Sequence, residues 1–431
     1  MKYTVRFGAA LVISCLSSSV WSVNMPPKNP YLADSRYALG HVDSAQQDSV
    51  ATAGPVDTSR ALKPSEIEYA PIGPAYFGIQ TSGLYQDERR VLWGNGLDRL
   101  VKLDHDTHEV LSTYYLPDAE KIYTEQDAEE AIAVFEESND GIGAIYNGFQ
   151  QAQKLKSLTS LYTLLDRTNT YFVSDKRGFM TAYGDVEPGV RDSAIEPKRT
   201  FRFPEEVTGY GMGINMTYDG WLVTVTENGE LLAIKPDFSD YRFGKLQHSE
   251  GASEKKTGRT GYAWVRNGLA IDKEGGIYIA SQEYMHKVIW TGDGFSTEET
   301  DGAWAVAYDN SWGHGTGATP SLMGFGDDED NLAVITDGAE RMNLVLYWRD
   351  EIPADWQALP GQPRRVAGIQ PVTMGEQNLQ KIQSEQSVVV GGYGAIVVNN
   401  KARNIPWYMP EQAATLLISF MGSNPKHQPY G

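Results

Sequence analysis

The sequence predicts an all-β fold assembled from small repeated sheets. Six stretches share one pattern, a β-rich apolar run, a small or polar break and a second apolar run, at residues 91–104, 171–183, 221–235, 276–290, 331–348 and 395–409. Aromatic residues make up 11% of the chain, and its 43 glycines can supply turns between the runs. The copies recur every ~50 to 80 residues, which fits a β-propeller with about six visible blades, each burying its faces against its neighbours around an axis. A large β-sandwich would explain the alternation but not the repeated strand–turn–strand unit.

The first 22 residues have the features of an export signal. Lys2 and Arg6 form a positive start, residues 7–16 are apolar but too short to cross a bilayer as a helix, and residues 20–22 offer a cleavage site. Residues 12–15 also resemble a bacterial lipobox, in which Cys15 would be lipidated and become the first mature residue. The first alternative predicts a periplasmic or secreted protein, and the second predicts an outer-membrane lipoprotein anchored through Cys15.

Residues 23–70 are polar and rich in Pro, Ser, Ala and Asp, which predicts an extended surface arm with little structure of its own. The propeller is expected over residues 71–431. Most copies add an earlier strand through a short Asp-, Asn- or Gly-containing turn, as at 218–220, 273–275 and 391–394, which is typical of hairpins. Cys15 is the only cysteine, so packing rather than a disulfide must stabilise these sheets.

Two segments interrupt the β pattern. Thr124 as N-cap predicts a helix to about residue 138, within an insertion around 124–158 that serves as packing or as a lid. Residues 410–421, with proline at their start and Gly422 after their end, predict another helix. Because the sixth copy lacks clear outer strands, either the arm completes the ring or the sequence is a piece of a propeller of ~7 or 8 blades.

The formal charge of −19 argues against nucleic acid, whose phosphates need a basic surface, and against docking on anionic lipid. No segment after the leader is long and apolar enough to cross a membrane. An acidic surface keeps an exported protein soluble and can attract cations. The expected partner is a small-molecule ligand at one mouth of the propeller axis.

Residues 267–272 (NGLAID) and 275–280 (GGIYIA) resemble a blade of the gluconolactonase and strictosidine-synthase-like propellers, a superfamily that includes calcium-dependent lactonases and phosphotriesterases. The resemblance implies that Asn267 binds a central metal and that Glu68 corresponds to the family's glutamate. Where the next blade of that family has an aspartate before a glycine, residues 317–321 (GATPS) carry no carboxylate. The likeness is specific in one blade and general elsewhere.

A second resemblance is to the quinoprotein-like propellers. Residues 100–110 (LVKLDHDTHEV) look like their blade motif, with His108 where glycine is usual. The tryptophan-docking pattern of those enzymes does not recur along the chain. A quinone-dependent dehydrogenase is therefore the weakest of the functional alternatives.

Aligning the turns places Asn267, Thr319 and Gln386, with neighbouring Glu385, at matching inner positions of their blades. Their oxygens are hard donors, of which Ca²⁺ takes about six to eight. Such an ion would polarise a lactone or ester carbonyl and lower the pKa of a bound water. The alternative is that these side chains hydrogen-bond the inner strands or channel water.

The glycine-dense segment 312–317 (WGHGTG) leads into an inner strand, and its His314 is the candidate acid or base. A tight loop in which His314 caps backbone groups is the alternative. The sequence contains no GxSxG motif and no paired His–Cys zinc spacing. It predicts an exported, calcium-dependent hydrolase of the lactonase or esterase type that acts on a small molecule at the central channel. A non-catalytic binding or scaffold propeller at the cell envelope is the alternative function.

Overall fold

The computed structural model of the chain describes residues 24–33, 43–50, 60, 62–67, 72–74, 77–137, 162–255, 263–328 and 330–401, with a few positions between 143 and 150. The predicted leader with Cys15, the predicted metal ligand Glu68 and the predicted helix 410–421 lie outside the described residues. Within the described ranges, none of the helices is long and apolar enough to cross a membrane.

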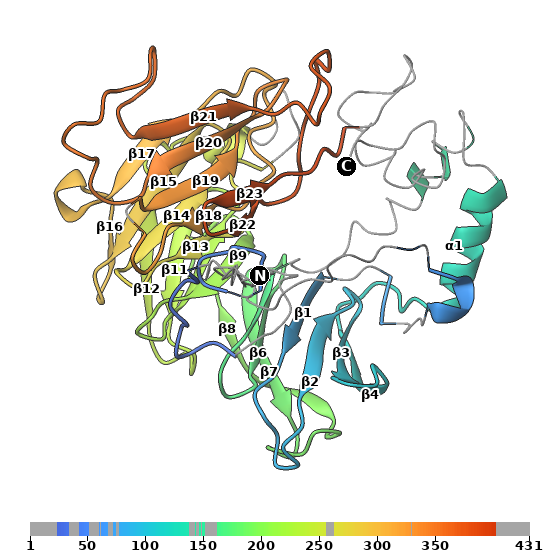
Figure 1. Cartoon of the computed structure of the whole chain (residues 1–431). Coiled ribbons are helices and arrows are strands. Elements are labelled where there is room, and N and C mark those ends of the chain that lie inside the picture. The colour runs from blue at the N-terminus through green and yellow to red at the C-terminus, as the bar shows by residue number, and fades with distance from the viewer. Residues whose placement is uncertain are drawn as a thin grey trace, which may run out of the picture.

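The strands of the described residues form six sheets, each made of strands that follow one another in the sequence and pair antiparallel. Four sheets have four strands, one has five and one has two. In Figure 1 the sheets fan out around a common centre. The predicted all-β propeller with a small helical insertion is confirmed.

The strands are assigned to blades in chain order. Blade 1 contains β1 (Phe77–Thr81), β2 (Val91–Asn95), β3 (Arg99–Asp104) and β4 (Val110–Tyr115). Blade 2 contains β5 (Thr163–Leu165), β6 (Tyr171–Ser174), β7 (Phe179–Asp185) and β8 (Ile195–Arg202). Blade 3 contains β9 (Gly211–Met216), β10 (Leu222–Thr226), β11 (Glu230–Ile234) and β12 (Tyr241–Lys245).

Blade 4 contains β13 (Ala270–Ile271), β14 (Gly276–Ala280), β15 (Tyr284–Trp290), β16 (Phe295–Ser296) and β17 (Trp304–Ala307). Blade 5 contains β18 (Ser321–Met323), β19 (Leu332–Thr336), β20 (Asn343–Trp348) and β21 (Val366–Pro371). Blade 6 contains β22 (Val389–Gly391) and β23 (Gly394–Ile396). Short helical segments are η1 (Pro64–Glu66), α3 (Ala252–Lys255) and η2 (Glu299–Asp301).

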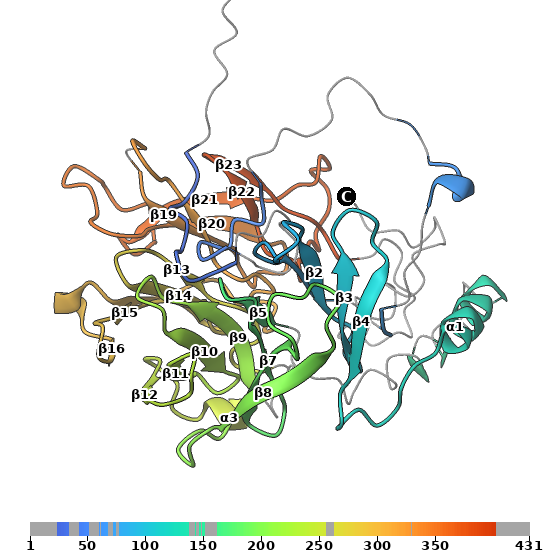
Figure 2. The ribbon, with the colours of Figure 1, turned by 90° about the horizontal axis from the view of Figure 1, so that it is seen from below.

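The first strand of each blade faces the axis. Strand β1 contacts β5, β5 contacts β9, β9 contacts β13, and β18 contacts β22. At the rim, β4 contacts β8 and β12 contacts β16. The blades therefore stand side by side around the hub, and residues far apart in sequence meet there (Figures 1 and 2).

Alternation along the middle strands explains why the sheets stack. In β10, Leu222 packs into the apolar layer between blades 2 and 3, whereas Val223 and Val225 pack into the layer between blades 3 and 4. Because both faces of the sheet are buried, apolar side chains lie on both faces of the strand and all five of its residues are buried. Full burial of one such side chain contributes about 1.5–3 kcal/mol, so the stacked layers stabilise the ring.

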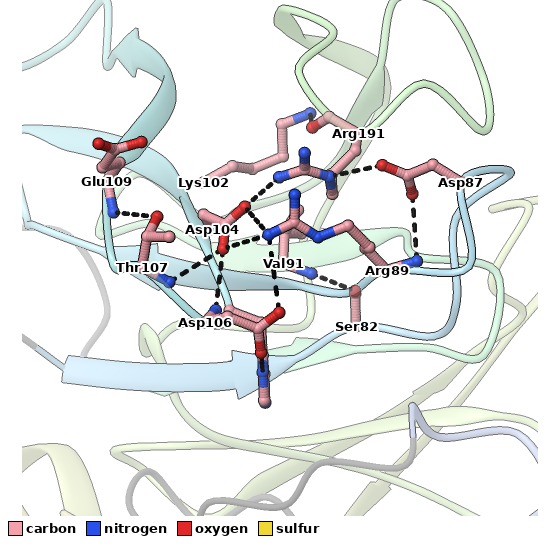
Figure 3. Close-up of polar contacts among 11 residues, drawn as sticks. Ser82, Asp87, Arg89, Val91, Lys102, Asp104, Asp106, Thr107, Glu109 and Arg191 are labelled. Carbon is pink, nitrogen blue, oxygen red and sulfur yellow. Dashed lines mark hydrogen bonds and ion pairs between the residues drawn. The ribbon is translucent and has the colours of Figure 1, made fainter.

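Charged residues also join blade 1 to blade 2. Lys102 on β3 has a side chain that is 0% exposed, and its Nζ donates to Asp185 Oδ1 at 2.5 Å and to the carbonyl oxygen of Arg191 at 2.9 Å. Burial lowers the pKa of Lys102, while the Asp185 carboxylate opposes that shift. Figure 3 shows the adjoining Asp104, whose carboxylate accepts from Arg89 at 2.9 Å and also from Arg191. Hydrogen bonds to both blades thus accompany the apolar layer at this seam.

The helix α1 (Glu125–Glu137) lies in the predicted insertion, outside the ring and beyond blade 1 (Figures 1 and 2). Thr124 caps it as expected, since its Oγ1 accepts from the backbone N–H of Asp127 at 3.2 Å. The Asp127 carboxylate accepts in return from the Thr124 N–H at 2.8 Å, which completes a reciprocal cap. Ile132 on this helix is 58% exposed.

The arm crosses the ends of the inner strands in two passes. In the first pass, Pro27 accepts from the Tyr218 hydroxyl of blade 3, and Leu32 forms an isolated bridge with Asp166 of blade 2. In the second pass, residues 43–50 run over blades 3 to 6 near the centre of the ring, drawn in dark blue in Figure 1. The arm is therefore bound to the propeller over residues 24–33 and 43–50.

Candidate functional site at the hub

The inner strands of blades 4, 5 and 6 are joined where each begins. The backbone N–H of Gly268 donates to the Thr319 hydroxyl at 2.9 Å. The backbone N–H of Thr319 donates in turn to the Ser387 hydroxyl at 3.1 Å. Residues 268, 319 and 387 thus occupy successive places around the axis. Thr319 is itself a candidate site residue, and residues 268 and 387 directly follow the candidates Asn267 and Gln386.

Asn267 is 6% exposed and uses its amide inside the hub. Its Nδ2 donates to the carbonyl oxygen of Thr316 at 3.0 Å, which links blade 4 to the loop that enters blade 5. Thr319 is 1% exposed, and its hydroxyl already accepts from the Gly268 N–H. Both side chains therefore act as connections between neighbouring blades.

Glu385 is the negatively charged member of an ion pair at this end of the hub. Its carboxylate accepts from the Arg266 guanidinium at 2.6 Å, and its backbone N–H donates to Asn400 Oδ1 at 2.8 Å. The Arg266 side chain is 12% exposed and that of Glu385 37% exposed, so the ion pair lies at the boundary with solvent. Gln386 beside it is exposed, and its backbone N–H donates to the Ser384 hydroxyl at 3.1 Å.

Tyr162 reaches across the axis from the start of blade 2. Burial raises the pKa of its phenol, while hydrogen bonds to the Thr319 side chain and the Gly268 backbone oppose that shift. Arg266 and Asp48 lie close enough to influence the same pKa. One aromatic side chain therefore connects blade 2 with blades 4 and 5 through the middle of the ring.

Glycines bring the inner strands into direct contact. A Cβ added to Gly213 would lie 2.7 Å from the Cα of Gly268, so blades 3 and 4 touch backbone to backbone. A Cβ added to Gly317 would lie 2.2 Å from the carbonyl oxygen of Ser384, which brings blades 5 and 6 equally close. Only glycine permits such an approach, and it narrows the hub.

The arm binds the opposite ends of the inner strands. The Ser44 carbonyl accepts from the Ile271 N–H at 2.6 Å, and the Ala45 carbonyl accepts from the Leu322 N–H at 2.9 Å. The Gln47 carbonyl accepts from the Val390 N–H at 2.8 Å. Backbone groups of blades 4, 5 and 6 that would otherwise face the mouth of the hub are thereby satisfied.

His314 lies in the loop before β18 and is half-buried. Its ring meets the Trp312 ring edge-on at a centroid separation of 5.4 Å. The Lys381 and Lys401 ammonium groups lie 5.1 Å and 4.4 Å from the centroid of that indole. The N–H of Gly315 donates to Asn310 Oδ1 at 2.7 Å, which holds the loop.

This donor set does not fit a calcium ion. The Thr319 hydroxyl and the Asn267 amide are used between blades, and the Glu385 carboxylate is paired with Arg266. Among the described residues there is no group of three or more His, Cys, Asp or Glu side chains that could hold a metal ion. Calcium prefers about six to eight oxygen ligands, commonly including several carboxylates.

Sequence reasoning missed Arg266, Tyr162 and the arm residues 43–50. Arg266 directly precedes the predicted ligand Asn267, but its partner Glu385 is 119 positions away, and no local pattern marks that pair. Tyr162 lies within the early strand predicted at residues 161–165, and no motif distinguishes it from its neighbours there. Residues 44, 45 and 47 accept from the inner strands through backbone carbonyls, which leave no trace in side-chain composition.

Two grooves open at the rim between blades. One, of about 510 Å³, lies between blades 4 and 5 and includes Lys287, Trp304 and Asp350 in its lining. The other, of about 340 Å³, lies between blades 1 and 2 and includes Tyr114, Asp118 and Arg177. Both are within or near the size range of small-molecule sites.

The topology defines a β-propeller whose inner strands are joined by hydrogen bonds at the hub and whose rim has grooves between blades. The sequence matches no protein-family profile. It is 30% identical over 386 residues to an uncharacterized protein of Archaeoglobus fulgidus, an alignment that covers 87% of this chain and 64% of that protein. The chain thus spans slightly less than two thirds of its relative's length.

Several solved structures align with the chain at low similarity. Virginiamycin B lyase from Staphylococcus aureus is 10% identical, with 66% of this chain and 72% of that chain covered and a TM-score of 0.36. The β-propeller domain of Cps50 (Swd1) from Myceliophteria thermophila is 8% identical, with 71% and 74% covered and a TM-score of 0.37. At these scores, the propeller assignment rests on the sheet topology of the chain itself.

Proposed function

We propose that this protein is a non-catalytic binding or scaffold propeller of the cell envelope, with a hub that is held together without a metal. The observation that carries the proposal is the Arg266–Glu385 ion pair at 2.6 Å, which engages the carboxylate that the alignment of the turns makes a candidate metal ligand. A metal ion coordinated by the Glu385 carboxylate would leave the Arg266 guanidinium, whose side chain is 12% exposed, without that partner.

The location at the envelope is supported by the export features of residues 1–22. The charge of −19 suits a protein that stays soluble in that setting. Because the inner strands are bonded closely to one another at the hub, and a ligand of small-molecule size needs a concave site, the rim grooves are the better candidates for ligand binding. Binding in a rim groove is therefore the function that the geometry favours over hydrolysis at the axis.

Metal analysis of the purified protein tests this proposal. We expect less than one calcium per chain after dialysis, and the same melting temperature in chelator and in calcium. Asn267→Ala and Glu385→Ala should leave the calcium content unchanged. The exposed turn variant Glu274→Ala serves as a control for loose binding to surface carboxylates.

A calcium-dependent hydrolase would give a different result. One tightly bound calcium per chain, lost in Asn267→Ala but kept in Glu274→Ala, would overturn the proposal, as would calcium-dependent cleavage of phenyl acetate or a simple lactone that His314→Ala abolishes. An absorbance spectrum of the same preparation tests the quinone-dependent alternative. We expect only the absorbance of the polypeptide and its aromatic side chains, with no additional band from a cofactor.

A further inference from the structure

The smaller rim groove lies between the outer strand of blade 1 and the two outer strands of blade 2. Residues of β4, β7 and β8 line it, together with the turn before β7. Figure 2 shows β8 alongside β4 at the edge of the ring. The groove occupies about 340 Å³, at the lower end of the range for small-molecule sites.

Aromatic rings form one part of the groove. Tyr183 of β7 is 7% exposed, and burial raises the pKa of its phenol. Tyr114 of β4 is half-buried, with its ring centroid 5.5 Å from that of Tyr183 and the two planes inclined at 56°. Phe179 at the start of β7 is also half-buried. The groove therefore offers apolar ring surface that water only partly covers.

A charged triplet forms another part. The Arg177 guanidinium lies 2.6 Å from an Asp175 oxygen and 3.4 Å from an Asp118 oxygen, so it joins blade 2 to blade 1. The Arg177 side chain is 59% exposed, whereas those of Asp118 and Asp175 are 23% and 12% exposed. The backbone N–H of Arg177 also donates to Asp175 at 2.8 Å, which fixes the turn that presents the guanidinium.

Two hydroxyls complete the lining. Thr181 of β7 and Thr200 of β8 face each other with their oxygens 3.2 Å apart. Each hydroxyl can donate and accept a hydrogen bond, so the pair can bind either a donor or an acceptor group of a ligand. The groove thus combines ring faces, a planar fork of donors, carboxylate acceptors and neutral hydroxyls.

We infer that this groove binds a neutral saccharide of one or two sugar units. The C–H faces of a pyranose pack on aromatic rings, and its neighbouring hydroxyls can accept from Arg177 while donating to Asp118. The inference deepens the proposed binding function and rests on it. It assigns the ligand class and the blade seam where the ligand binds.

The charges of the triplet favour a neutral ligand over an ion. Arg177 already lies between the two carboxylates, so an incoming cation would meet a guanidinium. With one carboxylate in excess, an anion would be repelled. The larger groove is less suitable for stacking, because Trp304, the aromatic residue in its lining, is 5% exposed, whereas Tyr114 in the smaller groove is half-buried.

Titration of the full-length protein with maltose, cellobiose, lactose and N,N′-diacetylchitobiose, followed by ligand-observed NMR, tests the inference. We expect at least one sugar to bind and Tyr114→Leu to weaken that binding by about tenfold, because leucine keeps the apolar bulk but lacks the ring face. Asp118→Asn should weaken it as well. Tyr115→Ala is the matched control, since Tyr115 follows Tyr114 on β4, is 52% exposed and lies over Arg99.

Failure of all four sugars to bind would overturn the inference, and so would binding that Tyr114→Leu and Tyr115→Ala affect equally. Binding of tetramethylammonium in place of the sugars would contradict the assignment of a neutral ligand. None of these results would alter the calcium content measured at the hub, so the two proposals fail separately. Circular dichroism of each variant verifies that the propeller is folded.

Discussion

Asp337 follows β19 and is a buried carboxyl, 4% exposed, whose surroundings make its ionisation costly. Burial raises the pKa of Asp337 to about 6, although hydrogen bonds from Asn343 and the Ala339 N–H oppose the shift. Because the neutral acid is favoured in the folded state, this group's contribution to stability is complete below its unfolded pKa near 3.8. That contribution is lost as pH rises through about 6.

Asp337→Asn removes this loss, since the side chain stays neutral at every pH. We expect the free energy of unfolding of the variant, relative to the parent protein, to increase between pH 4 and 6 by about 3 kcal/mol and then level off. Urea unfolding at several pH values measures it, with the exposed Glu274→Gln as control. A difference that does not change with pH would show that Asp337 ionises normally in the folded protein.

At the level of single residues, the sequence predicted where a residue lies in its blade better than it predicted which residue it contacts. Alignment of the turns places Asn267 and Thr319 at the inner ends of their strands, where the structure also has them. It could not reveal that Arg266 pairs with Glu385, because that contact depends on how far one blade is rotated from the next. The ion pair of the candidate site could therefore not be predicted from the sequence, because it depends on how the blades are arranged in space.

Among the elements, the arm is held by side-chain as well as backbone contacts. Asn29 has the central role, since its Nδ2 lies 2.7 Å from the carbonyl oxygen of Met216 and 3.0 Å from the Ser44 hydroxyl. It therefore connects the first pass of the arm with the second and with the end of β9. Loss of this amide would leave a buried carbonyl without its donor.

We predict that Asn29→Ala loosens the second pass of the arm. The amides of Ile271, Leu322 and Val390, which donate to arm carbonyls, should then exchange with solvent at least severalfold faster than in the parent protein. Hydrogen–deuterium exchange measures this, and Val50→Ala, at a side chain 43% exposed, is the control. Unchanged protection at these three amides would mean that the backbone contacts alone hold the arm.

Strands were the most predictable elements. The expected runs 276–281 and 285–290 correspond to β14 and β15, because apolar residues that recur in a strand buried on both faces leave a strong pattern. The run expected at 395–400 is shorter in the structure, where β23 ends at Ile396. The arm was expected to lie extended on the surface, yet residues 44–47 are buried, because backbone hydrogen bonds place them in the hub regardless of side-chain type.

The whole molecule carries a net charge of −19, and mutual repulsion of its carboxylates opposes the compact state. The Debye length falls from ~30 Å at 0.01 M salt to ~8 Å at 0.15 M, which screens this repulsion across the surface. The Lys102–Asp185 pair is screened much less, because the lysine side chain is 0% exposed.

We therefore expect the melting temperature to rise by a few degrees between these two salt concentrations. Sodium chloride and choline chloride should act equally, and calcium chloride at matched ionic strength should add nothing more. Differential scanning calorimetry measures the effect. A melting temperature that falls as salt is added would indicate that exposed ion pairs outweigh the repulsion.

The arm also affects how the chain reaches its native state. The ribosome makes Ser49 early, but its hydroxyl donates to the carbonyl oxygen of Val390, 341 positions later. Blades made in between can stack on their neighbours as they emerge, whereas the seating of this segment must wait for blade 6. Seating of the arm thus depends on a contact between the start of the described chain and blade 6, so a nascent protein stalled before blade 6 would expose its unfinished centre to chaperones and proteases.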